Sequence, residues 1–218
     1  MQSSDFEFLT GTGELSLEVP VTPRARERVL NFIRAQFMSH FGAEVDDDAP
    51  TLVGAFDSGG DLIAAFGLRG SADGFFCERY LSGTVAQVLA DCYRRPLTAS
   101  EVVEVVHLCA VRPGFLVRLM PLLAQALQRS GFRFLVCTAT GCLSSFFMRK
   151  GLPALHLGIA DPLCLEPGER ERWGKYYDKQ PQVIAGDLSV ACGLLEPIGP
   201  ALVLAPARPT VTQRAGGV

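Results

Sequence analysis

Two titratable side chains, Glu104 and His107, stand in an otherwise apolar run, EVVEVVHLCAV at residues 101–111. A continuous apolar run of this kind is typical of a buried strand, in which a carboxylate without a partner is costly. Glu104 therefore either reaches solvent or an arginine at the strand end, or it has a raised pKa that suits general-base catalysis. Both alternatives stay open on the sequence.

His107 is either a second base, a group that orients Glu104, or a core histidine whose hydrogen bonds are satisfied. Successive side chains of a strand point to opposite faces, which separates Glu104 and Val106 from His107 and Cys109. The two titratable groups share a site only if a β-bulge intervenes, and bulges gather beside active sites. Catalysis by this pair therefore requires a defect in the strand.

An RPG turn, Arg112 to Gly114, follows the strand and precedes an apolar helix that ends at Gly131. Backbone amides at the start of this helix suit a pyrophosphate or a phosphopantetheine phosphate, and an ordinary turn with exposed arginines is the alternative. Pro121 lies inside the helical pattern, so the helix either begins near Arg118 or is kinked at the proline.

A second strand (FRFLVCTAT, residues 132–140) and a second helix (CLSSFFMRKGL, residues 142–152) complete this segment. Strand, loop, helix, strand and helix in this order are similar to the arrangement in which GNAT-type acyltransferases splay two strands to hold a thioester. We therefore expect an α/β, GNAT-like fold with a mixed central sheet, splayed strands and flanking helices.

The preceding residues predict elements that support this sheet. A helix begins with Thr22 as N-cap and Pro23 at its first position, and ends at Gly42. Two strands at 51–56 and 62–68 flank a DSGG turn. The remaining predictions are an edge strand at 15–19, a third strand or bent extension at 75–81, a helix at 85–93 and one short strand within 153–165.

Composition bounds the class of protein. The 218 residues are 48% apolar, which predicts one domain at 1–196, followed by a loosely ordered Pro-, Ala- and Gly-rich tail at 197–218. The formal charge of 20 − 23 = −3 lacks the excess of positive charge that non-specific binding to nucleic acid requires. Neither a signal peptide nor a membrane-spanning run is visible, so a cytoplasmic location is expected.

The cysteines are odd in number and form no C-x-x-C pair, which argues against a disulfide framework and a zinc site. We interpret them as buried thiols and expect no metal. They are residues 77, 92, 109, 137, 142, 164 and 192. The stretch WGKYY at 173–177 gathers three large aromatic residues beside a glycine, which either line an acyl or acceptor pocket or cap the core.

Several short motifs together resemble the thermostable hemolysin family, a bacterial group named for a haemolytic phenotype and expected to have a GNAT-like fold. They are FIRAQF (32–37), FGA (41–43), GLR (67–69), EVVHLCA (104–110), TAT (138–140), FMRKGL (147–152), ADP (160–162), WGKYY (173–177), Pro181 and AGD (185–187). The resemblance spans about residues 30 to 195.

The same positions are more distantly similar to acyl-homoserine lactone synthases, in which an acyl carrier protein delivers the acyl group to an amine. This resemblance implies N-acyl transfer, with Glu104, His107 and Tyr176 as catalytic candidates. The residues that it implies for substrate binding are Arg34, Phe37, Arg69, Thr138, Thr140 and Trp173. Those that it implies for donor binding are Cys109, Ala110, Val111, Arg112, Gly114 and Arg118.

Three departures from these patterns affect the expected chemistry. RPGFLVR at 112–118 lacks the second glycine of many pyrophosphate loops, so acyl-CoA and a carrier-protein acyl-phosphopantetheine are equally plausible donors. Phe147 stands where many GNAT enzymes have the tyrosine that protonates the leaving thiolate, so Tyr176 or a water would take that part. His107 replaces an arginine of the signal synthases, so the acceptor does not transfer from them.

The sequence thus predicts an acyltransferase in which Glu104, directly or through water, deprotonates a small amine, an amino-acid-like molecule among the options. The backbone amides near Cys109 and Ala110 would hold the carbonyl oxygen. Val106, Leu108, Phe134 and Val136 are expected to wall the acyl group. The alternatives are a haemolysin that acts directly on membranes and a catalytically silent GNAT-like binding module.

Overall fold

The computed structural model describes residues 5–46, 49–149 and 151–195. Within these residues one sheet has eight strands in the order β1-β2-β3-β4-β5-β6-β8-β7. They are β1 (Phe6–Gly11), β2 (Leu15–Pro20), β3 (Thr51–Asp57), β4 (Leu62–Arg69), β5 (Val102–Ala110), β6 (Phe134–Ala139), β7 (Ala154–Ile159) and β8 (Gln182–Asp187). β5 and β6 are parallel, and each of the other pairs is antiparallel, so the sheet is mixed as predicted.

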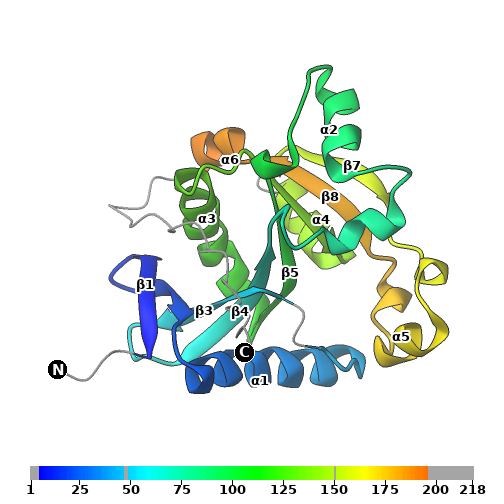
Figure 1. Ribbon diagram of the computed structural model, residues 1–218. Coiled ribbons are helices and arrows are strands. Elements are labelled where there is room, and N and C mark those ends of the chain that lie inside the picture. Colours follow the sequence, from blue (N-terminus) through cyan, green and yellow to red (C-terminus); the bar gives the residue numbers. More distant parts are fainter. Residues whose placement is uncertain (1–4, 47–48, 150, 196–218) are drawn as a thin grey trace, which may run out of the picture.

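Six α-helices surround this sheet in the described residues (Figure 1). They are α1 (Pro23–Phe41), α2 (Val85–Tyr93), α3 (Pro113–Arg129), α4 (Gly141–Arg149), α5 (Pro167–Arg172) and α6 (Leu188–Leu194). Short 3₁₀ turns lie at Phe76–Tyr80, Ala99–Glu101, Pro162–Cys164 and Tyr177–Lys179. Figure 1 shows α1 along one side of the strands and α3 beside α6 on another side.

Apolar side chains fill the space on both faces of the sheet. On one face Val103 and Val105 pack with α3, α4 and α6. On the other face Val106 packs against α1, and Val102 packs against α2. β5 therefore lies at the centre of the core, where a defect in its pairing opens space between the two faces.

Local signals in the first half of the chain form the predicted elements. The Thr22 side chain accepts the Ala25 N–H at 3.2 Å, Pro23 begins α1, and Gly42 ends it at φ 64°. The predicted hairpin is β3 and β4, and the helix predicted at 85–93 is α2. These predictions are confirmed because each rests on a cap, a turn or a periodic pattern within a few residues.

The strand predicted at 75–81 is wrong, because Phe76–Tyr80 is a 3₁₀ turn. The Glu78 N–H donates to the Phe75 carbonyl at 3.3 Å, and the Leu81 N–H donates to the Glu78 carbonyl at 3.0 Å. The Phe76 and Cys77 amides donate to the Glu104 side chain. A carboxylate from a distant strand therefore takes the amides that a sheet ladder would use.

The sheet is also larger than predicted. The strand expected at 15–19 is β2, which is not an edge strand because β1 pairs outside it. β8 and α6 were not predicted, and β8 lies between β6 and β7. α3 begins at Pro113 and continues past Pro121, which excludes the later start near Arg118. The tail predicted at 197–218 lies outside the described residues.

The predicted parting of two strands is confirmed between β5 and β6. Their parallel pairing runs from Val102 opposite Phe134 to Val105 opposite Cys137 and ends there. β5 continues to Ala110 against β4, while β6 continues to Ala139 against β8. The two strands therefore diverge beyond Val105. We call the gap between them the slot.

Candidate active site

The slot opens into a cavity of about 210 Å³. Its walls come from both parted strands, from the C-terminal part of α1, from the start of α3 and from Leu143 of α4. Leu108, Ala110 and Pro113 line it from the β5 side, and Thr138 and Thr140 line it from the β6 side. The strand defect therefore creates a cavity at the level of the predicted site residues.

β5 carries the bulge that the sequence argument requires. Against β4 the register shifts between Ala65 opposite Cys109 and Gly67 opposite Val106, which leaves one extra residue on β5. His107 lies in this stretch with φ 55°, a left-handed conformation that is uncommon outside glycine. The bulge changes the phase of the strand, so that Glu104 and His107 line one further cavity of about 40 Å³.

Glu104 is buried, with 1% of its surface exposed. Its Oε2 accepts the Phe76 N–H at 2.6 Å, and its Oε1 accepts the Cys77 N–H at 2.9 Å. Burial raises the pKa of this carboxyl, whereas the two backbone donors oppose the rise. Glu104 therefore holds the 3₁₀ turn in place, and each carboxylate oxygen has a second lone pair that can accept a proton.

Arg69 ends β4 directly opposite Glu104. Its guanidinium donates to the carbonyl oxygens of Gly74 at 3.0 Å and Asp73 at 2.9 Å. The segment 73–77 is thus tied to the sheet by a cation at its start and by a carboxylate at its end. Arg69 does not line either of the two cavities described above.

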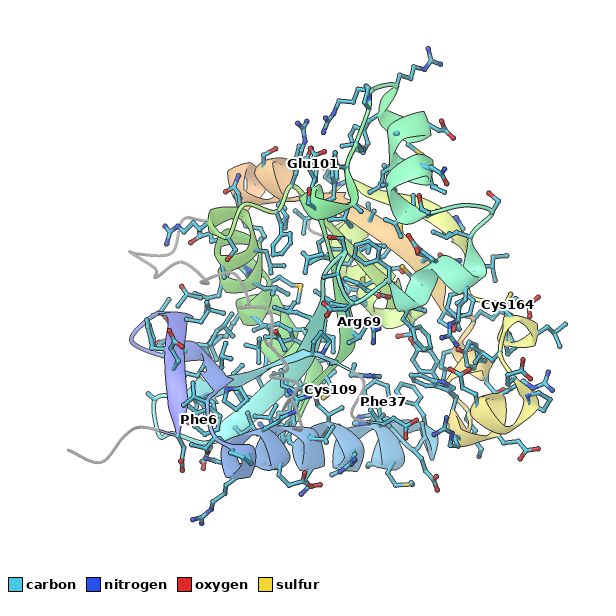
Figure 2. The ribbon with its side chains drawn as sticks, viewed as in Figure 1. Phe6, Phe37, Arg69, Glu101, Cys109 and Cys164 are labelled. Atoms are coloured by element: carbon cyan, nitrogen blue, oxygen red, sulfur yellow. The ribbon has the colours of Figure 1, made fainter. Side chains whose placement is uncertain are left out.

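Aromatic rings surround the His107 imidazole. The Phe37 ring lies edge-on to it at 5.8 Å between centroids, and the Trp173 ring stacks on it at 6.0 Å. Figure 2 shows Phe37 near Cys109, in the space between α1 and the sheet. Phe37 lines both cavities, and Trp173 lines the smaller one, so the structure brings these predicted residues together.

Tyr176 lies where the two cavities meet, and it lines both. Its hydroxyl donates to the Thr138 carbonyl at 3.0 Å. Burial raises the pKa of this phenol well above its ordinary value. A phenol of higher pKa is a weaker acid, so the environment of Tyr176 favours hydrogen bonding over proton release.

Thr138 presents a hydroxyl that the fold does not use. Its Oγ1 is buried, and no hydrogen-bond partner for it is found in the described residues. A buried polar atom without a partner is uncommon and calls for an explanation. Thr138 lines both cavities, and Thr140 lines the larger one, so this hydroxyl is placed to contact a bound molecule.

The start of α3 lies beside the mouth of the slot. Arg112 is the N-cap residue and Pro113 is the first helical residue, as the RPG pattern predicts. A Cβ added at Gly114 would meet nothing within 4 Å, so the backbone there is open to an approaching group. Arg118 instead forms an ion pair with Glu14, in the turn between β1 and β2.

One backbone amide of β5 is directed into the slot. The Val111 N–H donates to the Ile63 carbonyl of β4 at 2.9 Å. Successive N–H groups of a strand point to opposite sides, so the Ala110 N–H points away from β4 and toward the slot. Cys109 directs its thiol to the Ala65 carbonyl at 3.6 Å, and burial raises its pKa to about 12. The thiol is therefore protonated at neutral pH.

Arg34 lies outside this arrangement. Its Nε donates to the Val45 carbonyl at 3.2 Å, and its guanidinium pairs with Glu27 at 3.4 Å. It lines neither cavity. The structure therefore places Arg34 as a tie between α1 and the loop that follows it.

A third cavity, of about 60 Å³ and almost wholly apolar, continues from the slot between α3, α4 and α6. It shares Val105, Leu108, Cys137 and Leu143 with the larger cavity. Of the wall predicted from sequence, Leu108 lies here, whereas Phe134 and Val136 pack against α2 on the opposite face and Val106 packs against α1. That part of the predicted wall is wrong. The bulge after Val106 puts Leu108 on the opposite face from Val106, and on β6 it is Leu135 and Cys137 that face α3.

Sequence reasoning missed the side chains that α3 and α4 contribute. Leu116 and Leu143 line the slot, but an apolar helix residue carries no local sign that it faces a cavity. Tyr177, which belongs to the WGKYY cluster, lines the smaller cavity together with Phe76 and Tyr80. The aromatic composition of these segments was the signal available for this side of the site.

Among residues 5–46, 49–149 and 151–195, the side chains form no group of three or more His, Cys, Asp or Glu that could hold a metal ion. Within the same ranges, no helix combines the length and the apolar character that crossing a membrane requires.

Solved structures with this arrangement of sheet and helices define the class of fold. The AHL synthase LasI aligns with a TM-score of 0.54 at 14% identity, over 91% of this chain and 100% of that chain. The N-acyl amino acid synthase FeeM, from uncultured soil microbes, aligns with a TM-score of 0.51 at 15% identity, over 79% of this chain and 88% of that chain. The predicted GNAT-like acyltransferase fold is confirmed.

A third similar structure is the CoA-dependent acyl-homoserine lactone synthase BjaI with SAM and isopentyl-CoA. It has a TM-score of 0.51 and 14% identity, over 87% of each chain. The thermostable hemolysin family matches residues 19–192, so the chain belongs to that family, as the sequence motifs indicated. A search of curated proteins gives no match.

Proposed function

We propose that this protein is an N-acyltransferase that moves an acyl group from a thioester of coenzyme A or of an acyl carrier protein to a small amine. One observation carries the proposal: β5 and β6 part beyond Val105 and open a cavity of about 210 Å³ beside the start of α3. A slot between parallel strands admits an extended pantetheine arm, because both bordering strands offer backbone hydrogen-bonding groups.

The donor enters from the α3 side in this proposal. Its phosphate groups lie against the amides that follow Pro113, with the Arg112 side chain nearby and Gly114 allowing close approach. The acyl chain continues into the apolar cavity between α3, α4 and α6. The similar structures include an enzyme named for coenzyme A dependence, which supports a thioester donor.

The acceptor amine approaches from the aromatic side, where Glu104 and His107 line the smaller cavity. The amine gives up a proton to the Glu104 carboxylate, directly or through water, and its nitrogen attacks the thioester carbon. A C–N bond forms while the carbonyl oxygen becomes negative, and the Ala110 N–H donates to that oxygen. The C–S bond then breaks, and the thiolate takes up the proton that left the amine.

Each remaining residue supports these steps in the proposal. The raised pKa of Glu104 makes it a better proton acceptor than an exposed carboxylate. The Thr138 hydroxyl, which lacks a partner in the described residues, binds a pantetheine amide or the acceptor nitrogen. Tyr176 donates to the Thr138 carbonyl, and it thereby fixes the β6 wall of the slot.

The test is an assay of thiol release by purified protein with a panel of acyl-CoA and acyl-carrier-protein donors. Each donor is incubated with and without a panel of primary amines, and the N-acyl product is identified by mass spectrometry. The proposal expects amine-dependent thiol release with at least one pair, and its loss in Glu104→Gln. Donor binding measured by calorimetry without turnover of any pair would instead indicate a silent binding module.

A further inference from the structure

We infer that the acceptor is a cationic amine that carries no carboxylate beside its reacting nitrogen. This inference rests on the proposed function and refines it, since it concerns the smaller cavity and not the donor slot. Seven rings of the described residues line the cavity, and five of them are here called the aromatic cage: Phe37, His107, Trp173, Tyr176 and Tyr177. The other two are Phe76 and Tyr80.

Several rings of the aromatic cage meet at steep angles, whereas His107 lies at 24° to Trp173 and Phe37 at 28° to Tyr176. Phe37 is inclined to His107 by 87° and to Trp173 by 68°. Tyr177 is inclined to Trp173 by 81° and to Tyr176 by 87°. Rings that meet in this way turn faces as well as edges toward a common space, and the faces of Trp and Tyr rings attract cations.

The volume of the space limits what fits. At about 40 Å³ the cavity holds an ammonium group and a few adjoining carbons, and the remainder of an acceptor must extend toward the slot. Phe37, His107, Thr138 and Tyr176 are shared with the larger cavity, so this group lies next to the thioester position. The reacting nitrogen is therefore the part that the cage surrounds.

The charges of the lining favour a cation. Glu104 is the one carboxylate among the described residues that line the cavity, and no Arg or Lys is among them. Arg69 lies outside the lining, where its charge acts on Glu104 and its guanidinium donates to two loop carbonyls. The Arg79 guanidinium pairs with Glu169 at 2.7 Å and lies over the Phe76 ring. A carboxylate next to the reacting nitrogen would lose its water without gaining a cationic partner, which is costly.

An ammonium meets the opposite situation in the same space. It gains the ring faces and the Glu104 charge in exchange for its hydration. Its transfer of a first proton to Glu104 leaves a neutral amine and a neutral acid in a buried site, which is the arrangement that burial favours. After attack, the second proton leaves the nitrogen for the departing thiolate, and Glu104 releases its proton to solvent. Recognition of the cation and activation of the nucleophile therefore use the same residues.

The experiment uses Trp173, the single tryptophan of the chain, as a fluorescent reporter of its own cavity. The full chain is titrated at neutral pH, without an acyl donor, with butylamine, norvaline and norvalinamide. Norvaline is butylamine with one carboxylate added beside the nitrogen, and norvalinamide has the same branch without the negative charge. The three ligands therefore separate charge from bulk.

The expected result is a saturable change with butylamine and norvalinamide, at affinities within about threefold of each other, and at least about tenfold weaker binding of norvaline. Equal or tighter binding of norvaline overturns the inference. Norvalinamide as weak as norvaline also overturns it, because bulk would then account for the exclusion. An unchanged spectrum with all three amines overturns it as well.

Two cage variants keep the reporter and remove a ring. Phe37→Leu and Tyr177→Leu are each expected to weaken butylamine binding by about three- to thirtyfold. Phe8→Leu, which replaces an exposed ring on β1, is the matched control and is expected to leave the titration unchanged. A melting curve identifies any variant that is unfolded, and unchanged butylamine binding in both folded cage variants contradicts the cage.

Binding and turnover then distinguish the two proposals. Saturable binding of butylamine together with no thiol release from any donor would support amine binding by the aromatic cage and contradict the proposed acyl transfer. Amine-dependent thiol release that is faster with norvaline than with butylamine keeps the proposed function and removes this inference.

Discussion

The two halves of β5 differ in how their backbone is used. Val102 to Val105 pair with β6, and Glu104 and Val105 pair with β4 at the same time, whereas beyond Val105 the strand pairs with β4 alone. The closed half carries Glu104, whose carboxylate binds the turn at Phe76 and Cys77. The open half frees a backbone edge and side chains on both faces. One strand thus anchors the core at one end and presents a binding edge at the other.

This difference shows why the site lies at a defect in the sheet. A paired strand uses its amides for stability, and only a parted strand has amides to offer a ligand. Four variant experiments test this division between the closed half and the open half. The largest effect is expected where a single backbone group of the open half is removed.

Ala110→Pro removes the N–H that points into the slot while leaving the Val111 N–H on β4 in place. We expect kcat to fall by about 10²- to 10³-fold, which is typical of the loss of one oxyanion donor. Thermal unfolding should stay close to that of the wild type, because the lost N–H is outside the β4 ladder. Wild-type kcat in a folded Ala110→Pro protein would contradict an oxyanion role.

Glu104→Gln tests whether a residue of the closed half also acts as the general base. An amide NH₂ would face one of the two backbone donors, so we expect a loss of about 1–3 kcal/mol in the free energy of unfolding. If Glu104 is the base, kcat also falls at least about a hundredfold. Asp187→Asn is the control for the effect of removing a buried carboxylate on stability, because asparagine retains the oxygen that accepts from Ser189 and Val190 and loses only the contact of Oδ2 with Arg133 at 3.8 Å. Asp187 also lines the apolar cavity, so the kcat of this variant is not part of the comparison.

The raised pKa of Glu104 makes stability and activity change in opposite directions with pH. The folded pKa lies above its ordinary value of 4.5, so the native state binds the proton more tightly than the unfolded state does. The contribution of Glu104 to stability is therefore greatest below 4.5 and is lost as the pH rises through the folded pKa. Over the same window kcat should rise as the base ionises.

Unfolding by urea and kcat, measured between about pH 4 and pH 8, check both trends with Glu104→Gln as the reference protein. The stability of the wild type relative to the variant should fall as its kcat increases. If relative stability and kcat increased together with pH, the pKa of Glu104 would be lowered in the folded protein. That result would contradict the proposal that burial raises the pKa of Glu104 for its role as a base.

Thr138→Val tests the unpaired hydroxyl at a smaller scale. Removing a buried polar atom that lacks a partner should leave stability unchanged or raise it by about 1 kcal/mol, while kcat/KM for the donor falls about tenfold. Thr10→Val is the matched control, since its buried hydroxyl also lacks a partner in the described residues but lies on β1. A loss of activity in both variants, or in neither, would contradict the claim that the Thr138 hydroxyl contacts the bound donor.

Gly114→Ala is expected to have the smallest effect. Gly114 and Gly168 each follow a proline that begins a helix, and an added Cβ meets nothing within 4 Å at either position. Both alanine variants should gain up to about 0.5–1 kcal/mol in stability. Only Gly114→Ala should raise KM for the donor, by about two- to fivefold. Equal KM values for the two variants would place the donor phosphates elsewhere.

Elements set by short-range rules were predictable from the sequence. The Thr22 cap, the DSGG turn and the glycine at residue 42 fix their structures within a few residues, and all three were confirmed. The parting of β5 from β6 was also predicted, since the order of elements from residue 101 resembles a known fold. The cap, the turn and the glycine need no knowledge of distant partners, whereas the parting of the strands was predicted from the resemblance.

The remaining features depend on contacts between distant segments. The turn at Phe76 forms because Glu104, on another strand, captures its amides. β8 lies between β6 and β7 although it follows both in sequence, so no local pattern reveals its place. From the sequence, a bulge was only a requirement for Glu104 and His107 to share a site, and its presence was not predicted. In the structure the bulge at His107 turns Leu108 toward α3. Sequence alone named several residues that line the cavities, among them Phe37, His107 and Thr138, but not the directions in which they point.

Amide hydrogen exchange of β5, followed by NMR with and without a non-hydrolysable acyl-pantetheine analogue, tests the slot most directly. Without the analogue, the amides of Val103 to Val105 should be protected and that of Ala110 should exchange quickly. With the analogue at saturation, the account predicts at least about tenfold slower exchange at Ala110 and little change in the closed half. Unchanged exchange at Ala110 with the analogue bound would contradict the claim that the thioester lies between the parted strands.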